Sequence, residues 1–179
     1  MRWRRLLDET ADVYLGLGSN VGDRLAALRT AASAIGANPD VSVVAASGVY
    51  ETEAHVLPGA PPQPDHLNAV LHVRTRLHPR AVLNIAQAVE WRAGRDHAAP
   101  RWGPRVLDVD LLLYGDDELR ADGLTLPHPR LAGRRFVLAP LAELASHRVV
   151  PGLNRTIADL LAATPDTADV RRTDLDLLA

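Results

Sequence analysis

The sequence contains no cysteine and no lysine among its 179 residues. Without cysteine there can be no disulfide, no zinc-thiolate site and no catalytic thiol, and a cytoplasmic location is the expectation. Without lysine there can be neither the phosphate-binding lysine of a P-loop nor Schiff-base chemistry. Any metal ion must therefore be held by oxygen or imidazole ligands, and any polyphosphate by arginine, which supplies all 20 basic residues.

The chain also lacks long apolar runs and an excess of charge of one sign. No run approaches the roughly 20 apolar residues that a membrane span requires, so a membrane role is not expected. The net charge of −2 gives no general basic field for nucleic acid. The remaining partners are small molecules, and we expect a monomer.

The length suits one domain over residues 1–179 with a core of its own. Residues 1–12 carry arginines and acids without the apolar stretch of a signal peptide, so they are expected to form a short tail. The acidic residues 165–179 are expected to form a frayed tail at the other end.

Hydrophobic periodicity predicts strands interleaved with helices. The expected strands are 13–17, 41–50, 66–76, 106–114 and a short extended piece at 124–129, and the expected helices are 25–36, 78–94, 136–144 and 154–163. The β-α-β-β-α-β order predicts an α+β fold, a ferredoxin-like α/β sandwich whose mainly antiparallel sheet has helices packed on one face. Segments 51–65 and 94–104 are long polar loops of the kind that carry function.

The acidic pair Asp108 and Asp110 is the most informative feature. Residues two apart in a strand point to the same face, so the two carboxylates lie side by side. At a sheet edge both would simply face water. Their neighbours are apolar, however, as in a buried strand, where carboxylates are costly unless a cation compensates them. We therefore predict a magnesium site, since magnesium is usually held by one or two carboxylates together with waters and phosphates.

Arginines cluster on both sides of this strand. Arg95, Arg101 and Arg105 precede it, and Arg134 and Arg135 lie in a later polar segment. A single arginine is usually a solvated surface residue. The planar guanidinium group also forms charge-assisted, often bidentate hydrogen bonds to phosphate oxygens. The clustering therefore favours a polyphosphate site.

Three further signals are weak. The run from Gly16 to Asn20 follows a strand but matches neither nucleotide-binding glycine motif, and a helix cap at Ser19 or Asn20 explains it without a ligand. The amide of Asn68 could read the edge of a heterocycle. His128, between two prolines, could be structural or could contact a phosphate.

Together these segments resemble the family of 6-hydroxymethyl-7,8-dihydropterin pyrophosphokinases. The motif is the block from Arg101 to Tyr114, which reads R-W-G-P-R-V-L-D-V-D-L-L-L-Y. Shorter pieces occur in the family's order at 15–20, 47–52, 67–70, 94–95 and 124–129, together with Glu90, Arg134 and Phe136.

The resemblance implies an ATP-dependent diphosphotransferase that moves pyrophosphate from ATP to the pterin's hydroxymethyl group and releases AMP, with two Mg2+ ions. It implies that Asp108 and Asp110 bind both ions, that Arg95 and Arg105 hold phosphates, and that loops 51–65 and 94–104 close over the substrates. Further implied ATP residues are Glu90, Trp102, Leu111, His128 and Arg134. The implied pterin residues are Thr52, His66, Asn68 and Phe136.

Some positions depart from the family pattern. His66 stands where many members carry an aromatic ring, Glu53-Ala54 replaces a frequent proline pair, and His97-Ala98 stands where basic residues are common. Two rivals stay open: a catalytically silent pterin- or nucleotide-binding member of the fold, and a different D-x-D enzyme such as a nucleotidyl or glycosyl transferase.

Overall fold

The computed structural model describes residues 10–54, 62–95, 103–121 and 123–178. Its strands are β1 (Ala11–Ser19), β2 (Val41–Ala46), β3 (Tyr50–Thr52), β4 (His66–Thr75), β5 (Asp108–Tyr114), β6 (Leu119–Ala121), β7 (Leu124–Leu126), β8 (Val149–Val150), β9 (Arg155–Thr156) and β10 (Val170–Arg172). Its α-helices are α1 (Arg24–Gly36), α2 (Pro79–Arg92), α3 (Arg135–Ala145) and α4 (Ile157–Ala163).

Within the described ranges, six strands form one sheet in the order β10-β3-β4-β1-β5, with β2 also pairing with β4. Every pairing in this sheet is antiparallel. The arrangement in which β1 lies between β4 and β5 is that of a ferredoxin-like β-α-β-β-α-β unit, so the predicted fold class is confirmed. No helix in the described part of the chain is long and apolar enough to cross a membrane.

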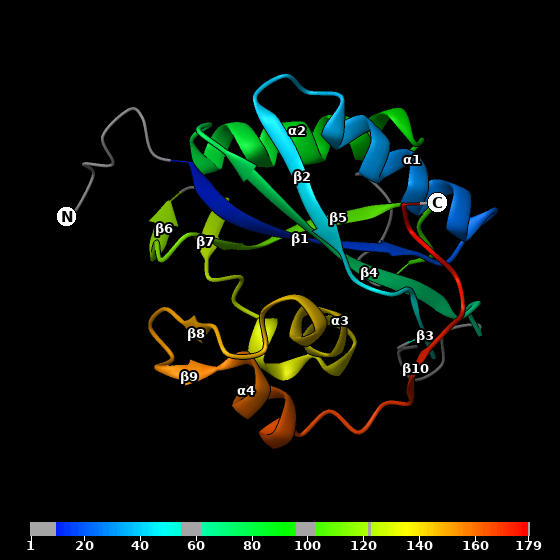
Figure 1. The fold of residues 1–179 in the computed structure, drawn as a ribbon. Helices are drawn as coiled ribbons and strands as arrows, with labels where there is room; N and C mark the ends of the chain where they lie inside the picture. The colour runs from blue at the N-terminus through cyan, green and yellow to red at the C-terminus, as the bar shows by residue number, and fades with distance from the viewer. Residues whose placement is uncertain (1–9, 55–61, 96–102, 122, 179) are drawn as a thin grey trace.

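Helices cover both faces of this sheet, so the prediction that they cover one face is wrong. Figure 1 shows α1 and α2 on one side of the sheet and α3 and α4 on the other. We call these the α1/α2 face and the α3/α4 face. The second layer is needed because Tyr14, Val70 and Leu112 are buried and apolar on the side away from α1 and α2.

Strand alternation divides the core between the two faces. On the α1/α2 face, Leu15 of β1 and Leu71 of β4 are about 1% exposed or less and belong to one apolar cluster with the inner sides of both helices. On the α3/α4 face a second cluster joins Val70 and Leu113 to Leu138 and Leu141 of α3.

Strand β5 contains a bulge at Leu112. Leu15 of β1 is opposite Leu111, but Tyr14 is opposite Leu113, so one residue of β5 has no partner in the register. Leu112 and Leu113 consequently both belong to the cluster on the α3/α4 face. The carbonyl oxygen of Leu112 accepts a hydrogen bond from the backbone N–H of His128 at 2.9 Å.

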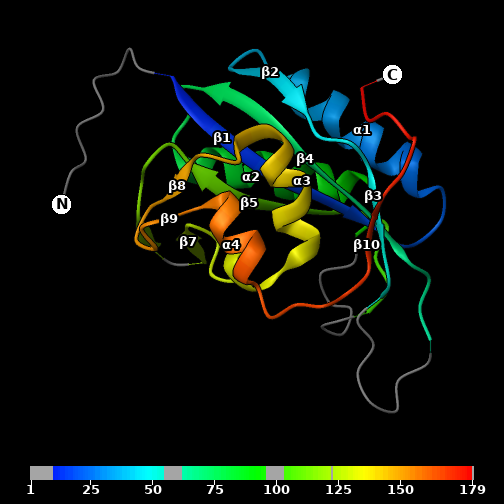
Figure 2. The ribbon, with the colours of Figure 1, turned by 60° about the horizontal axis from the view of Figure 1, so that its bottom comes forward.

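The C-terminal segment is ordered, in contrast to the predicted frayed tail. Strand β10 pairs with β3, the N–H of Thr173 donates to the carbonyl of Val49 at 2.9 Å, and Leu177 is only 2% exposed. In Figure 2 the segment runs from α4 to lie beside β3. These contacts could not be predicted from the acidic composition, because their partners lie far away along the chain. Strand β1 begins at Ala11, inside the predicted N-terminal tail, and residues 1–9 lie outside the described ranges.

Candidate active site

The floor of a cavity of about 570 Å³ lies on the α3/α4 face, where the central strands carry small or polar residues. In the register of β1, Gly18 is opposite both Asn68 of β4 and Asp108 of β5, and Gly16 is opposite Asp110. A Cβ atom on Gly18 would lie 3.3 Å from the Asn68 side-chain oxygen. The missing side chain therefore leaves room above the floor for a bound molecule.

Asp108 and Asp110 both line this cavity, as the spacing predicted. Asp108 is held by two guanidinium groups: it accepts from Arg95, and from Arg105 Nη1 at 3.0 Å. Burial raises the pKa of Asp108, but the charges of Arg95 and then Arg105 outweigh that effect, so its pKa is lowered. Asp108 is therefore a carboxylate at neutral pH.

The negative charge of Asp110 is balanced less well by neighbouring positive charge than that of Asp108. In the described part of the chain, His128 Nε2 lies 3.9 Å and Arg134 Nη1 lies 3.7 Å from its carboxylate oxygens, and both distances are longer than a hydrogen bond. Burial and then the negative charge of Asp108 raise the pKa of Asp110. A cation placed between the two carboxylates would remove this cost, which is the electrostatic condition for a metal site.

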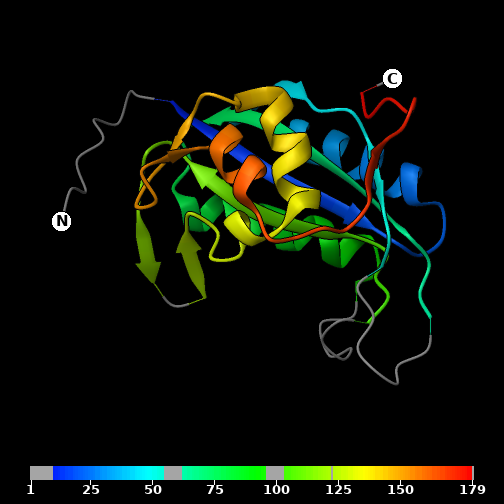
Figure 3. The same ribbon diagram turned by 90° about the horizontal axis from the view of Figure 1, so that it is seen from below.

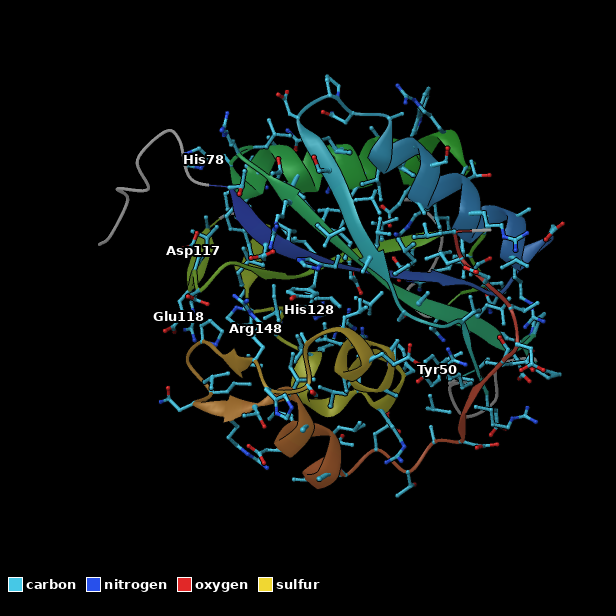
Figure 4. The ribbon with its side chains drawn as sticks, viewed as in Figure 1. Tyr50, His78, Asp117, Glu118, His128 and Arg148 are labelled. Carbon is cyan, nitrogen blue, oxygen red and sulfur yellow. The ribbon has the colours of Figure 1, made fainter. Side chains whose placement is uncertain are left out.

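His128 and Arg134 approach Asp110 from two different segments. Figure 4 shows His128 between the sheet and α3. The bond from its backbone N–H to Leu112 ties the segment after β7 to the bulge in β5. Burial and the neighbouring arginines lower the pKa of His128 against the opposing effect of Asp110. Its imidazole is thus a neutral hydrogen-bonding group beside the acidic pair.

Glu90 belongs to α2, and its side chain, which is 5% exposed, reaches the edge of β5. Its Oε1 accepts a 2.7 Å bond from the N–H of Val109 and also contacts Arg95. Burial raises the pKa of Glu90 to about 7, although the Val109 bond and Arg95 act in the opposite direction. The side chain thus connects α2 to the strand that carries both aspartates.

The residues predicted for a ring-shaped substrate line the same cavity: Thr52, His66, Asn68 and Phe136. Asn68 Nδ2 donates to Thr52 Oγ1 at 2.8 Å, which leaves its carbonyl oxygen facing Gly18. Burial, followed by the charge of Arg105, lowers the pKa of His66, so that imidazole is neutral. The guanidinium carbon of Arg134 lies 5.3 Å from the centroid of the Phe136 ring.

Among the predicted ATP residues that the structure describes, Arg105 and Arg134 line this cavity, whereas Glu90, Arg95, Leu111 and His128 do not. Leu111 is 4% exposed and packs in the cluster of the α1/α2 face. Trp102 lies outside the described residues, as do 55–61 and 96–101 of the two predicted loops. The roles of Leu111 and Trp102 at the nucleotide therefore stay predictions.

The role of Asn20 differs from the one favoured from the sequence, which was a helix cap. The cap of α1 is Asp23, whose Oδ1 accepts from the N–H of Ala26 at 3.0 Å. Asn20 instead connects two loops: its Oδ1 accepts from the N–H of Arg105 at 2.8 Å, and its Nδ2 donates to the carbonyl of Pro64 at 3.3 Å. Only the three-dimensional proximity of these loops reveals the role.

The cavity brings together two carboxylates, the guanidinium groups of Arg105 and Arg134, and the amide of Asn68. In the described part of the chain, no group of three or more histidine and carboxylate side chains could hold a metal ion by itself. A metal bound here would therefore need further ligands from a substrate or from water. The groups of this cavity suit the transfer of a phosphate-containing group.

Comparisons with known proteins agree with this chemistry. The family model described as 7,8-dihydro-6-hydroxymethylpterin-pyrophosphokinase matches residues 14–146. A 2-amino-4-hydroxy-6-hydroxymethyldihydropteridine pyrophosphokinase of Synechocystis sp. is 38% identical over 154 residues, covering 86% of this chain and 76% of its own. The enzyme of the same name from Bacillus subtilis is 40% identical over 131 residues, 73% of this chain and 76% of its own.

The solved structures show the same fold at lower sequence identity. A crystal structure of Plasmodium falciparum HPPK-DHPS, a triple mutant, matches with a TM-score of 0.66 at 14% identity. The match covers 88% of this chain and 45% of that chain, so this protein spans less than half of the larger molecule. The chain belongs to the 7,8-dihydro-6-hydroxymethylpterin-pyrophosphokinase family of folate-synthesis enzymes.

Proposed function

We propose that the cavity on the α3/α4 face is where this enzyme transfers pyrophosphate from ATP to 6-hydroxymethyl-7,8-dihydropterin. The family makes the chain an ATP-dependent diphosphotransferase that acts on small molecules. The observation that carries the assignment of the site is that the acidic pair and the amide of Asn68 line one cavity. The polyphosphate of ATP and the pterin ring would then bind next to each other in this cavity.

The pterin is proposed to occupy the end of the cavity lined by Thr52, Asn68 and Phe136. The bond from Asn68 to Thr52 fixes the amide, whose remaining donor and acceptor can read the polar edge of the ring. Phe136 is proposed to stack on one ring face and His66 to contribute to the other, since a neutral imidazole can also stack.

The ATP phosphates are proposed to bind toward Arg95, Arg105 and Arg134, with His128 assisting. Arg95 and Arg105 neutralise Asp108, so their guanidinium groups already lie beside a carboxylate that lines the cavity. Their forked donors suit phosphate oxygens, and they would stabilise the charge that develops as AMP leaves. Glu90 would act by holding Arg95 and the edge of β5 in place.

Asp108 and Asp110 are proposed to hold two Mg2+ ions. The residues fit this role, because magnesium needs only one or two carboxylates when phosphates and waters complete its shell, and because the carboxylate pair is not fully neutralised by protein cations. When bound, magnesium neutralises phosphate charge and makes a coordinated hydroxyl group more acidic.

The chemistry consists of an in-line displacement. The pterin's hydroxyl oxygen forms a bond to the β-phosphorus of ATP as the bond between that phosphorus and the bridging oxygen of AMP breaks, and the hydroxyl proton is released to water. The described residues of the cavity accomplish this by alignment: the ring site fixes the attacking oxygen, and the arginines fix the phosphates opposite it.

The test is to incubate the wild-type protein with ATP, magnesium and 6-hydroxymethyl-7,8-dihydropterin and to identify the products. AMP together with the pterin diphosphate is the expected outcome, and chelation of magnesium should abolish it. Release of ADP or of inorganic pyrophosphate would indicate a different transferase. Pterin binding without turnover would instead indicate the silent member of the fold. A monomeric state, a cytoplasmic location and closure of loops 51–65 and 94–104 stay predictions.

A further inference from the structure

The segment that follows α4 forms one wall of the substrate cavity. Figure 3 shows it running from α4 past the start of α3 toward β3. Pro165, Asp166 and Ala168 of this segment line the cavity that also contains Phe136 and Thr52. All three residues lie beyond the stretch matched by the family model, so the family assignment gives them no role.

The first attachment of this segment is at the start of α3. The helix begins after Arg134, whose side chain makes no capping hydrogen bond. Asp166 supplies the cap from a distance of 31 positions in the chain: its Oδ2 accepts from the N–H of Arg135 at 2.8 Å. Its Oδ1 accepts from the N–H of Ala168 at 3.0 Å, which fixes the carboxylate against its own backbone. A negative charge at this end of a helix is stabilising.

The second attachment is at β3, on the other side of the ring site. Val170 pairs with Thr52, the residue that accepts the hydrogen bond from Asn68. Glu143 of α3 reinforces the junction by accepting bonds from Tyr50 Oη at 2.6 Å and from Arg172 Nε at 2.8 Å. Figure 4 shows Tyr50 beside α3. The segment therefore spans from the helix that carries Phe136 to the strand that carries Thr52.

We propose that Asp166 is a positioning residue for the pterin: it fixes the first turn of α3 and thereby the ring of Phe136 over the floor of the cavity. The inference rests on the proposed function of the site. Phe136 is the next residue after Arg135, whose N–H the carboxylate binds, so loss of this bond loosens the turn that presents the aromatic ring. Of the residues proposed for ATP, only Arg134 adjoins this turn. Arg95, Arg105 and His128 lie on other segments, so ATP binding is affected less.

The experiment compares Asp166→Ala, Asp166→Asn and Asp169→Ala. Asn keeps an oxygen that can accept from the N–H of Arg135 and is itself a good helix cap. Asp169 belongs to the same segment, but its side chain is 71% exposed and pairs with Arg171 at 3.2 Å. We expect Asp166→Ala to raise the KM for the pterin about fivefold, the effect of losing a typical helix cap, with the KM for ATP and kcat within twofold. Asp166→Asn and Asp169→Ala should resemble wild type.

Hydrogen exchange at the Arg135 and Phe136 amides gives a readout that needs no turnover. Protection of these amides should fall in Asp166→Ala and return in Asp166→Asn. An unchanged KM for the pterin, or equal increases for pterin and ATP, would overturn the inference. Wild-type turnover is measured alongside: if wild type is inactive the proposed function fails, whereas an active wild type with an unaffected Asp166→Ala variant refutes the positioning role alone.

Discussion

The two faces of the sheet are built from the same strands, yet they do different work. On β5, Val109 and Leu111 point into the apolar cluster under α1 and α2, while Asp108 and Asp110 point into the cavity on the α3/α4 face. On β4, Leu71 likewise points into the apolar cluster and Asn68 points into the cavity. Burial of apolar area on one face supplies stability, and the other face can then carry desolvated charges that cost stability.

The largest effect is expected from Asp110→Ala, which changes only the cavity face. Turnover should fall by about three orders of magnitude, because a metal ligand is lost and metal assistance contributes several kcal/mol to catalysis. The fold should be kept, because removal of an incompletely compensated buried charge relieves a cost. Steady-state kinetics and thermal unfolding measure the two quantities. Near-normal activity in the folded variant would rule out the role of Asp110.

Leu71→Ala is the converse change, on the other face. Leu71 is 0% exposed, so the truncation should lower the free energy of unfolding by about 2–5 kcal/mol. Below the unfolding transition, the KM values for both substrates should stay within twofold of wild type. Denaturant unfolding and kinetics at low temperature provide the measurement. A large change in KM without a loss of stability would show that the two faces are not separable.

Phe136→Ala tests whether the proposed pterin site and the proposed phosphate site within the cavity are separable. Stacking of a heterocycle on an aromatic side chain contributes roughly 1–3 kcal/mol, so pterin affinity should fall by about 10- to 100-fold. The affinity for an unreactive ATP analogue should change by less than about threefold, since Phe136 is not proposed to contact it. Calorimetric titration of each ligand is the measurement. Equal losses would contradict the division.

A smaller, pH-dependent effect is expected at Glu90, where the two faces meet at the edge of β5. Burial raises the pKa of this carboxyl from 4.5 to about 7, so the folded protein binds the proton more tightly than the unfolded chain. The stabilisation is therefore complete below about pH 4.5 and is lost as the pH rises to about 7.

The Glu90→Gln variant lacks this titration while keeping an oxygen acceptor for Val109. Its Tm relative to wild type should accordingly increase by roughly 2–4 °C between pH 5 and pH 8, the shift that about 1 kcal/mol produces at this chain length. Thermal unfolding at several pH values is the measurement. Glu118→Gln, at an exposed carboxyl, is the control, and a parallel increase there would contradict the assignment to Glu90.

Much of the sheet was predictable because its signals are local. The alternation of Leu67, Ala69, Leu71 and Val73 predicted β4, and Pro79 after His78 predicted the start of α2. The predicted strand at 41–50 is two strands, because Ser47 leaves the ladder between β2 and β3 and bonds to the backbone of Val70. Strands β8 and β10 were missed because two- and three-residue strands carry no periodicity.

The candidate site was predictable only where its residues are close in sequence. Asp108 and Asp110 share a strand, so alternation alone placed them on one face. Asn20 was interpreted as a helix cap and Asp166 was not singled out, because their partners, Arg105 and Arg135, lie far away along the chain. Short polar side chains of this kind are usually solvated. Only the fold shows which backbone groups they meet.

The extra residue in β5 resets the strand's alternation partway along its length. Before Leu112, the even-numbered side chains point into the cavity; after it, the odd-numbered Leu113 takes that direction and packs under α3. The acidic part and the apolar part of one strand can thus each direct their side chains to the α3/α4 face, with a different alternation in each part. The carbonyl oxygen of Leu112 also accepts the hydrogen bond that holds the segment containing His128. The single extra residue in β5 therefore helps to place the imidazole beside the carboxylate pair.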